Sequence, residues 1–125
     1  MIKMIVYRLE HKQTHNGPFC DTFNLKITKK QREILNDLYE WASENKNTPG
    51  IYSDIPECKT TLNYNVREYV CGTISMDQLY HWFSQWLDDL LKMQFEIKTF
   101  EVPDDKVFVG KYQCIFHKEY AKEVQ

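Results

Sequence analysis

The sequence lacks the features that mark several large classes of protein. Its 125 residues carry a formal net charge of −2, which gives neither the basic footprint of a nucleic-acid-binding surface nor the strong acidity of a DNA-mimicking protein. No apolar run is long enough for a membrane span or for the core of a signal peptide. The sequence also contains no internal repeat and no low-complexity tract. These absences argue against direct nucleic-acid binding and against membrane insertion.

Closely spaced metal or disulfide motifs are absent as well. The chain has no Cys-x-x-Cys pair, and its cysteines are far apart in the sequence: Cys20, Cys58, Cys71 and Cys114. Disulfide frameworks and structural zinc sites usually show tighter spacing, so we expect reduced thiols and a cytoplasmic location. His11 and His15 are separated by the helical ligand spacing, but they flank a predicted strand end and a Gly-Pro loop. The sequence therefore predicts no metal site and no cofactor.

Catalytic motifs are missing too. There is no Ser-His-Asp order, no Gly-rich phosphate loop and no Asp/Glu pair at motif spacing. What the chain does have is 42% apolar and 14% aromatic residues, which is typical of a packed globule. Its length suits one domain over residues 1–125. We predict no catalytic residue and a single folded domain.

The densest apolar pattern lies between Cys71 and Phe116 and begins with a helix start. Ser75 and Gln78 have capping-box spacing: the Ser75 hydroxyl can accept from the Gln78 N–H, and the Gln78 side chain can reach back to the Ser75 backbone. Large apolar side chains then recur at helical spacing: Leu79, Tyr80, Phe83, Trp86, Leu87, Leu90 and Leu91. We predict one long amphipathic helix that supports the sheet. Trp82, at the edge of this stripe, either covers the core or is an exposed contact anchor.

A second helix is predicted from about Lys29 to Glu44, with Thr28 and Gln31 as its capping box. Four cations gather at its start: Lys26, Lys29, Lys30 and Arg32. Cations are unfavourable at the positive end of a helix dipole. Either this is a solvated basic face, or it binds an acidic partner surface or a phosphate.

Alternating apolar residues predict the strands. They cover residues 2–10, 95–102, 106–109 and 111–116, with shorter candidates at 23–27 and 67–71. The alternation changes phase after Ile97, which suggests a β-bulge. Residues 51–69 read as a long excursion. The expected architecture is α+β, with two main helices packed on a small twisted, mainly antiparallel sheet.

Three stretches carry a more specific pattern: Val6–His11 followed by Gly17–Phe19, then Ser75–Phe83, then Phe95–Phe116. Together they resemble a group of small phage and prophage proteins. In that group a "YR-E-H…GP(Y/F)" start precedes an "S-x-x-Q-L-x-x-W-F" helix and a "Y-E-V-P…V…G…Q-x-x-F" end. The resemblance implies a phage-encoded protein in the host cell cytoplasm.

The same order of pieces is distantly similar to ADP-ribosyltransferase-like folds, which carry an Arg or His strand, a Ser/Thr strand and a strand with a catalytic Glu. The resemblance would place Arg8 at the first motif, Ser75 near the second and Gln113 at the third. A neutral amide at the third position cannot support the positive charge that develops at the ribose carbon. The resemblance therefore implies a degenerate site, with Glu101 as the nearest carboxylate that could replace the missing one.

Three functions remain in competition. The first is a non-catalytic accessory protein that binds and inhibits a host protein, such as an antiviral defence component (an anti-CRISPR). The second is a nucleotide- or NAD-consuming enzyme that uses Arg8 and Gln113 in a cleft. The third is a virion assembly factor, although no fibrous or repetitive signature supports it. A homodimer is compatible with all three. The candidate binding residues are Arg8, Lys26, Lys29, Lys30, Arg32, Trp82 and Gln113.

Overall fold

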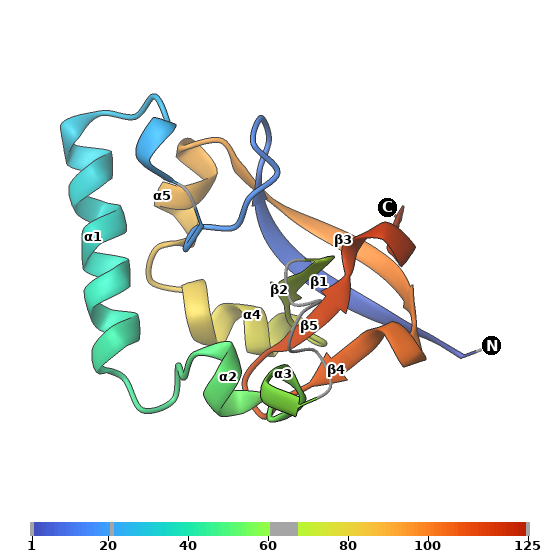
Figure 1. Ribbon diagram of the computed structural model, residues 1–125. Helices are drawn as coiled ribbons and strands as arrows, with labels where there is room; N and C mark the ends of the chain where they lie inside the picture. The colour runs from blue at the N-terminus through green and yellow to red at the C-terminus, as the bar shows by residue number, and fades with distance from the viewer. Residues whose placement is uncertain (1, 21, 61–67, 125) are drawn as a thin grey trace.

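The computed structural model describes residues 2–20, 22–60 and 68–124. The fold class is α+β, as the sequence predicts (Figure 1). The helices are α1 (Lys29–Glu44), α2 (Ile51–Asp54), α3 (Glu57–Thr60), α4 (Met76–Phe83) and α5 (Leu87–Lys92). Short 3-10 turns lie at Thr22–Asn24, Asp104–Lys106 and Lys118–Tyr120. None of the helices in the described ranges has the length and apolarity needed to cross a membrane.

In the part of the chain that the structure describes, the strands form two three-stranded sheets rather than one, and every pairing is antiparallel. The first sheet has the order β1 (Lys3–His11), β3 (Phe95–Pro103), β6 (Lys122–Val124). The second has the order β2 (Tyr69–Gly72), β5 (Cys114–His117), β4 (Val107–Val109). Tyr7 and Thr73 join the sheets, since each backbone N–H donates to the other residue's carbonyl at 2.8 Å. This junction places the start of α4 beside β1.

The long strand pair contains no bulge, so that prediction is wrong. β1 and β3 pair without interruption from Lys3 opposite Pro103 to His11 opposite Phe95. The change of phase has another cause: β3 contributes to a different core at each end. Phe95 packs against helices, whereas Phe100, on the opposite face of the strand, packs between the sheets. Apolar residues therefore shift from odd to even positions while the backbone stays regular.

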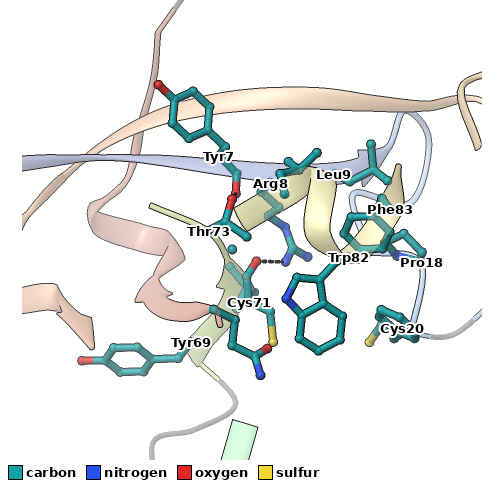
Figure 2. Close-up of a pocket in the computed structure, with 16 residues that line it drawn as sticks. Tyr7, Arg8, Leu9, Pro18, Cys20, Tyr69, Cys71, Thr73, Trp82 and Phe83 are labelled. Atoms are coloured by element: carbon teal, nitrogen blue, oxygen red, sulfur yellow. Dashed lines mark hydrogen bonds between the residues drawn. The ribbon is translucent and has the colours of Figure 1, made fainter. Parts of the chain in front are cut away.

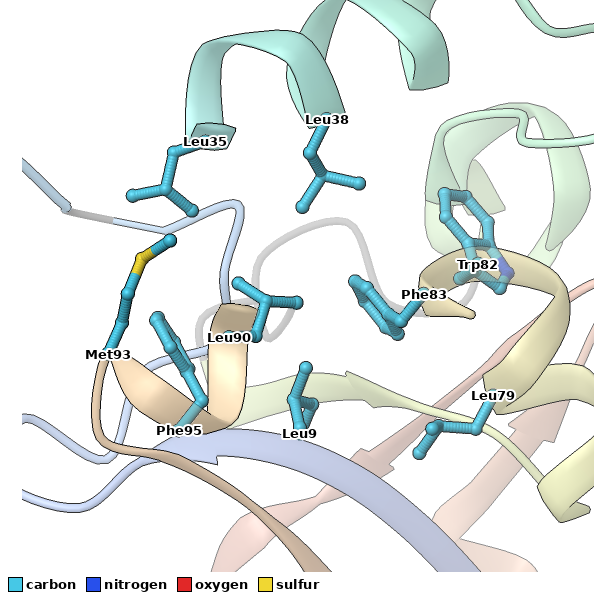
Figure 3. Close-up of a cluster of buried hydrophobic side chains, with 9 residues drawn as sticks. All are labelled: Leu9, Leu35, Leu38, Leu79, Trp82, Phe83, Leu90, Met93 and Phe95. Carbon is cyan, nitrogen blue, oxygen red and sulfur yellow. The ribbon is translucent and has the colours of Figure 1, made fainter. Parts of the chain in front are cut away.

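Two main clusters of buried side chains result. The helical core contains Leu9, Leu35, Leu38, Leu79, Trp82, Phe83, Leu90, Met93 and Phe95, drawn in Figure 3. The inter-sheet core contains Val6, Phe100, Val102, Val107, Cys114 and Phe116. β1 and β3 contribute to both. They therefore form the wall that separates the two cores.

The predicted single long helix is divided into α4 and α5, and that prediction is corrected. Residues 84–86 form a turn, in which the Trp86 N–H donates to the Phe83 carbonyl at 2.9 Å. No Gly or Pro marks this break. Instead the Trp86 ring packs on Trp41 of α1, with ring centroids 5.0 Å apart. Packing between helices, which local sequence does not reveal, accompanies the interruption.

The helix caps follow the sequence closely. Both hydrogen bonds of the Thr28–Gln31 capping box are present, and α1 has the predicted bounds. At α4 the Ser75 hydroxyl accepts from the Gln78 N–H at 3.1 Å, as predicted. The Gln78 side chain, however, accepts from the Ile74 N–H at 3.0 Å rather than from Ser75. Its Nε2 also donates to the Lys111 carbonyl at 3.2 Å, so Gln78 ties the helix start to the loop before β5.

Other segments depart from prediction. Residues 23–27 form no strand; a 3-10 turn takes part of that stretch, and Arg32 Nη2 donates to the Thr22 carbonyl at 2.8 Å. The predicted strand near 67–71 is present as β2. The strand predicted at 111–116 begins only at Cys114. The excursion at 51–69 contains α2 and α3, and its residues 61–67 lie outside the described ranges.

Candidate functional site

A pocket of about 310 Å³ opens where β1, β2, α4 and the loop at residues 17–20 meet. Aromatic and aliphatic side chains dominate its lining, among them Leu9, Pro18, Phe19, Leu79, Trp82 and Phe83. The polar side chains that line it are few, and Arg8 and Gln113 are two of them. An apolar hollow of this size with a few convergent polar groups is the usual form of a ligand site. It is the strongest candidate site in the described chain.

Arg8 lies at the edge of this pocket and is only 7% exposed. Its Nε donates to Glu10 Oε2 at 2.8 Å, and its Nη1 donates to the Cys71 carbonyl at 2.6 Å. Figure 2 shows the guanidinium directed into the space between Cys71 and Trp82. Nη2 has no hydrogen bond to any residue that the structure describes. Arg8 is thus fixed by two partners and keeps one nitrogen free for a third.

A buried carboxylate that sequence reasoning missed holds Arg8 in place. Glu10 is 1% exposed and contacts Arg8, Lys98 at 3.3 Å and Lys118. Burial alone would raise the pKa of Glu10, but hydrogen bonds from Lys118 and Arg8 outweigh it and lower that pKa below its ordinary value. Arg8 and Glu10 alternate on one face of a strand, which was the signal available in the sequence. Together these residues form the Glu10 cluster.

Gln113 reaches the pocket because a second carboxylate, also missed, shapes the loop before β5. Asp54 at the end of α2 accepts from the N–H groups of Lys111 at 2.8 Å, and of Tyr112 and Gln113 at 3.0 Å each. A Cβ at Gly110 would lie 2.4 Å from Asp54 Oδ2, so only glycine fits there. Gln113 Nε2 then donates to the Pro49 carbonyl at 2.8 Å. The amide of Gln113 therefore closes one wall of the pocket.

Trp82 belongs to the helical core and also lines the pocket. It is 8% exposed, and its Nε1 donates to the Tyr112 carbonyl at 2.9 Å. Of the two alternatives that its sequence position left open, the structure shows the buried one. The indole is held at both its ring and its nitrogen, so it forms a rigid wall.

Two thiols also face this space. Cys20 and Cys71 line the pocket and are exposed, whereas Cys58 and Cys114 are buried, and all four are free. Although part of Cys71 is exposed in the pocket, the protein atoms packed around it desolvate its thiol and raise the pKa, and the nearby charge of Arg8 opposes this rise only in part. A cysteine of this kind is a weak nucleophile at neutral pH. Its value is as a reporter of what fills the pocket.

The residues proposed for an ADP-ribosyltransferase-like site come together only in part. Arg8 and Gln113 line the same pocket, but Ser75 caps α4 and is not in the lining. Glu101 pairs with Lys3 at 3.1 Å and is also outside it. Among the described lining residues none is Asp or Glu. Among all the residues that the structure describes, no group of three or more His, Cys, Asp or Glu side chains could hold a metal ion.

One of the remaining candidate residues, Arg32, lines a second hollow. Phe19, Thr22, Phe23, Arg32, Asn36 and Tyr39 line it. We call this hollow, with the exposed Lys26, Lys29 and Lys30, the Phe23 surface, because Phe23 is 88% exposed. Phe19 is shared with the pocket. Arg32, by contrast, is engaged by Thr22, to which it donates from both Nη atoms.

Of three comparisons with known proteins, one found a match. A search of curated proteins and a search of solved structures each found no match. A family model described as "Bacteriophage T4 Y00F protein" matches residues 4–125. This match confirms the resemblance to small phage proteins, and it covers both the pocket and the Phe23 surface. The chain belongs to the family of the bacteriophage T4 Y00F protein.

Proposed function

We propose that this protein is a phage accessory protein that binds and inhibits a host protein through the Phe23 surface. The partner would present an acidic patch with an apolar pocket at its centre. A component of an antiviral defence system, such as a CRISPR effector, is the class of target that fits a small phage protein of this kind. The action is blocking rather than chemistry.

The observation that carries this proposal is the exposure of Phe23. Its side chain is 88% exposed and lies over a hollow that also contains Phe19 and Tyr39. Burying a Phe side chain contributes about 1.5–3 kcal/mol. Large aromatic side chains are also a main source of binding energy at interface centres. A phenylalanine held outside the protein's own core, with aromatic neighbours, therefore supports a role as an anchor for a partner.

The charges around Phe23 support an acidic partner. Lys29 and Lys30 lie in the first turn of α1, which contains no acidic residue, and Lys26 lies just before it. These cations meet the positive end of the helix dipole, which is unfavourable for the free protein by about 0.3–1 kcal/mol each. An acidic partner removes that repulsion and speeds association through its field. Charge and aromatic anchor thus favour the same kind of partner.

The test compares Phe23→Ala with Tyr52→Ala, because Tyr52 is also an exposed aromatic residue, at 48%, but lies outside both hollows. Tagged protein is recovered from the host with and without infection, and the same variants are assayed for relief of a host defence during phage plating. Loss of an anchor of about 2 kcal/mol should weaken retention of the partner roughly 30-fold. We expect Phe23→Ala to abolish both retention and relief, and Tyr52→Ala to retain both.

Charge reversal gives the second arm of the test. Lys29→Glu with Lys30→Glu should slow binding and remove its salt dependence, while the fold is unchanged because both side chains are exposed. The proposal is wrong if Phe23→Ala and the double reversal leave retention and inhibition at the wild-type level. It is also wrong if Phe23→Ala abolishes only self-association, since the surface would then belong to a homodimer.

A further inference from the structure

The structure assigns the pocket between β1, β2 and α4 as a binding site for an apolar carboxylate. In this arrangement the aromatic or branched aliphatic body of the ligand fills the hollow beside Trp82 and Phe83, and its carboxylate binds the guanidinium of Arg8. The pocket shares Phe19 with the Phe23 surface, but its ligand would contact Arg8, Trp82 and Phe83. The inference therefore does not rest on the function proposed above.

The guanidinium of Arg8 has one nitrogen, Nη2, whose N–H groups donate to no described residue. A guanidinium carries five N–H donors. Nε and Nη1 are already committed, to Glu10 and to the Cys71 carbonyl, and Nη2 has no partner among the described residues. Only 8% of the Arg8 side chain is exposed, and the side chain lines the pocket. An oxygen acceptor in the pocket would give this nitrogen a charge-assisted hydrogen bond.

The charged side chains around Arg8 determine the sign of the electrostatic field near its guanidinium. Three cations, on Arg8, Lys98 and Lys118, surround the single carboxylate of Glu10. Of these groups Glu10 is the most deeply buried, at 1% side-chain exposure. Glu96 and Glu123 also contact Lys98, but they are 38% and 53% exposed, and Lys118 is 38% exposed, so solvent screens all three. The two less exposed cations, Arg8 and Lys98 at 8% and 17% side-chain exposure, still outnumber Glu10. The field near Arg8 is therefore positive, which favours an ionised oxygen over a neutral one.

The rest of the pocket has the volume and lining of a site for one apolar group. Beyond Arg8 the lining is largely apolar, and no described lining residue is Asp or Glu. Its volume of about 310 Å³ accommodates one aromatic ring with a short side arm. A Cβ at Gly17 would lie 3.8 Å from both Nη atoms of Arg8, which leaves ordinary contact space beside the guanidinium. A single carboxylate on an apolar body matches this arrangement, whereas a polyanion such as a nucleotide does not.

The experiment measures binding to the full chain by calorimetry with three probes: 3-phenylpropionate, its neutral amide 3-phenylpropanamide, and acetate. Ligands of this size usually bind with a Kd on the order of 1 mM. We expect the acid to bind at least about tenfold tighter than the amide, equivalent to about 1.4 kcal/mol. Acetate, which lacks the apolar body, should show no saturable binding. This comparison needs no mutation, so folding does not affect it.

Two variants locate the site. Gly17→Leu would extend a side chain into the space beside Arg8, where a Cβ meets both Nη atoms at an ordinary contact distance of 3.8 Å. Gly50→Leu is its matched control, because a Cβ there meets nothing within 4 Å. Gly17→Leu should weaken binding of the acid at least about tenfold, and Gly50→Leu should leave it unchanged. In wild-type protein the bound acid should also slow alkylation of Cys71 by iodoacetamide.

The same chemistry could come from a free acid or from the C-terminal residue of a peptide. A peptide ending in a free phenylalanine carboxylate separates these sources, with its C-terminal amide as the control. If this peptide binds tighter than 3-phenylpropionate, the ligand is a chain terminus. If it binds more weakly, the ligand is a small molecule. Equal affinity for acid and amide, undiminished binding by Gly17→Leu, or no saturable binding of the acid would each overturn the assignment.

Discussion

Leu9 and Glu10 are neighbours in β1 and point to opposite faces of the same strand. Both are almost completely buried, at 3% and 1% exposure. Leu9 packs in the helical core among apolar side chains alone, whereas Glu10 lies among three cations behind the pocket. The two residues are therefore buried for different reasons. Burial of Leu9 removes apolar surface from water, whereas burial of Glu10 is made possible by the cations paired with its carboxylate.

The two faces of β1 contribute to the protein in different ways. The apolar face depends on shape and volume, so its stability should respond to truncation and hardly to pH. The charged face depends on partners: the desolvation of Glu10 is offset only while the cations are present. This face also orients Arg8 toward the pocket. The helical core thus supports the fold, and the Glu10 cluster positions the site.

The largest effect is expected on the apolar face. Phe95→Ala removes a ring that is 1% exposed and that packs edge-on against His11, with centroids 5.1 Å apart. Lost transfer energy plus a cavity should lower the free energy of unfolding by about 3–5 kcal/mol. Phe23→Ala, at an exposed position, should change it by no more than about 0.5 kcal/mol. Denaturant unfolding of both variants measures this, and similar values for the two would remove the distinction.

The charged face should respond next, and in a pH-dependent way. Glu10→Gln leaves Arg8 and Lys118 without their carboxylate and should cost about 3 kcal/mol at neutral pH. Because the pKa of Glu10 is lowered from 4.5 in the folded state, its contribution is full above that pH and is lost as the pH falls through the folded pKa. The gap in stability between wild type and Glu10→Gln should therefore narrow in acid.

Glu101→Gln is the matched control for this effect. Its ion pair with Lys3 has side-chain exposures of 50% for Lys3 and 34% for Glu101, so its loss should cost no more than about 1 kcal/mol. Unfolding is followed from about pH 7 to about pH 3. A constant gap across that range for Glu10→Gln would mean that charge is not what holds this face.

The smallest effect concerns the helix that carries Trp82 into both the core and the pocket wall. Ser75→Ala removes the hydroxyl that accepts from the Gln78 N–H, and should cost about 0.5–2 kcal/mol. Ser84→Ala, at the exposed C-terminal end of α4, should stay within about 0.5 kcal/mol of wild type. Both are read from the denaturation midpoint at constant slope. An unchanged midpoint for Ser75→Ala would show that Ser75 does not stabilise the start of α4.

Local chemistry in the sequence was enough to place α1, both N-caps and the long strand pair. Thr28 and Ser75 act within three residues of themselves, so their hydrogen bonds follow from spacing alone. The bulge after Ile97 and the unbroken helix were wrong for different reasons. The bulge assumed that the strand faces one core, whereas β3 faces two. The unbroken helix was predicted because no Gly or Pro interrupts it, whereas Trp86 packs on Trp41 of α1 at the turn.

The candidate site was only partly accessible from sequence. Arg8 and Gln113 entered through a resemblance, and the structure brings both to one pocket. Glu10 and Asp54 were missed because their partners are distant along the chain: Lys118 for Glu10, and the N–H groups before β5 for Asp54. Apart from the alternation of Arg8 and Glu10 on one face of β1, no local pattern marks these carboxylates, because their other partners come from different elements.

By itself the sequence determined the elements whose causes are local, since a cap, an apolar stripe or an alternating strand needs only its own neighbours. It also determined membership of a phage protein family, because that match rests on the chain alone. Only the tertiary structure decided which face of β1 became a core and which became an ion cluster. Alternation gives two faces but not what will cover them. Apolar side chains of the helical core cover Leu9, whereas cations surround Glu10, and Glu10 in turn orients Arg8.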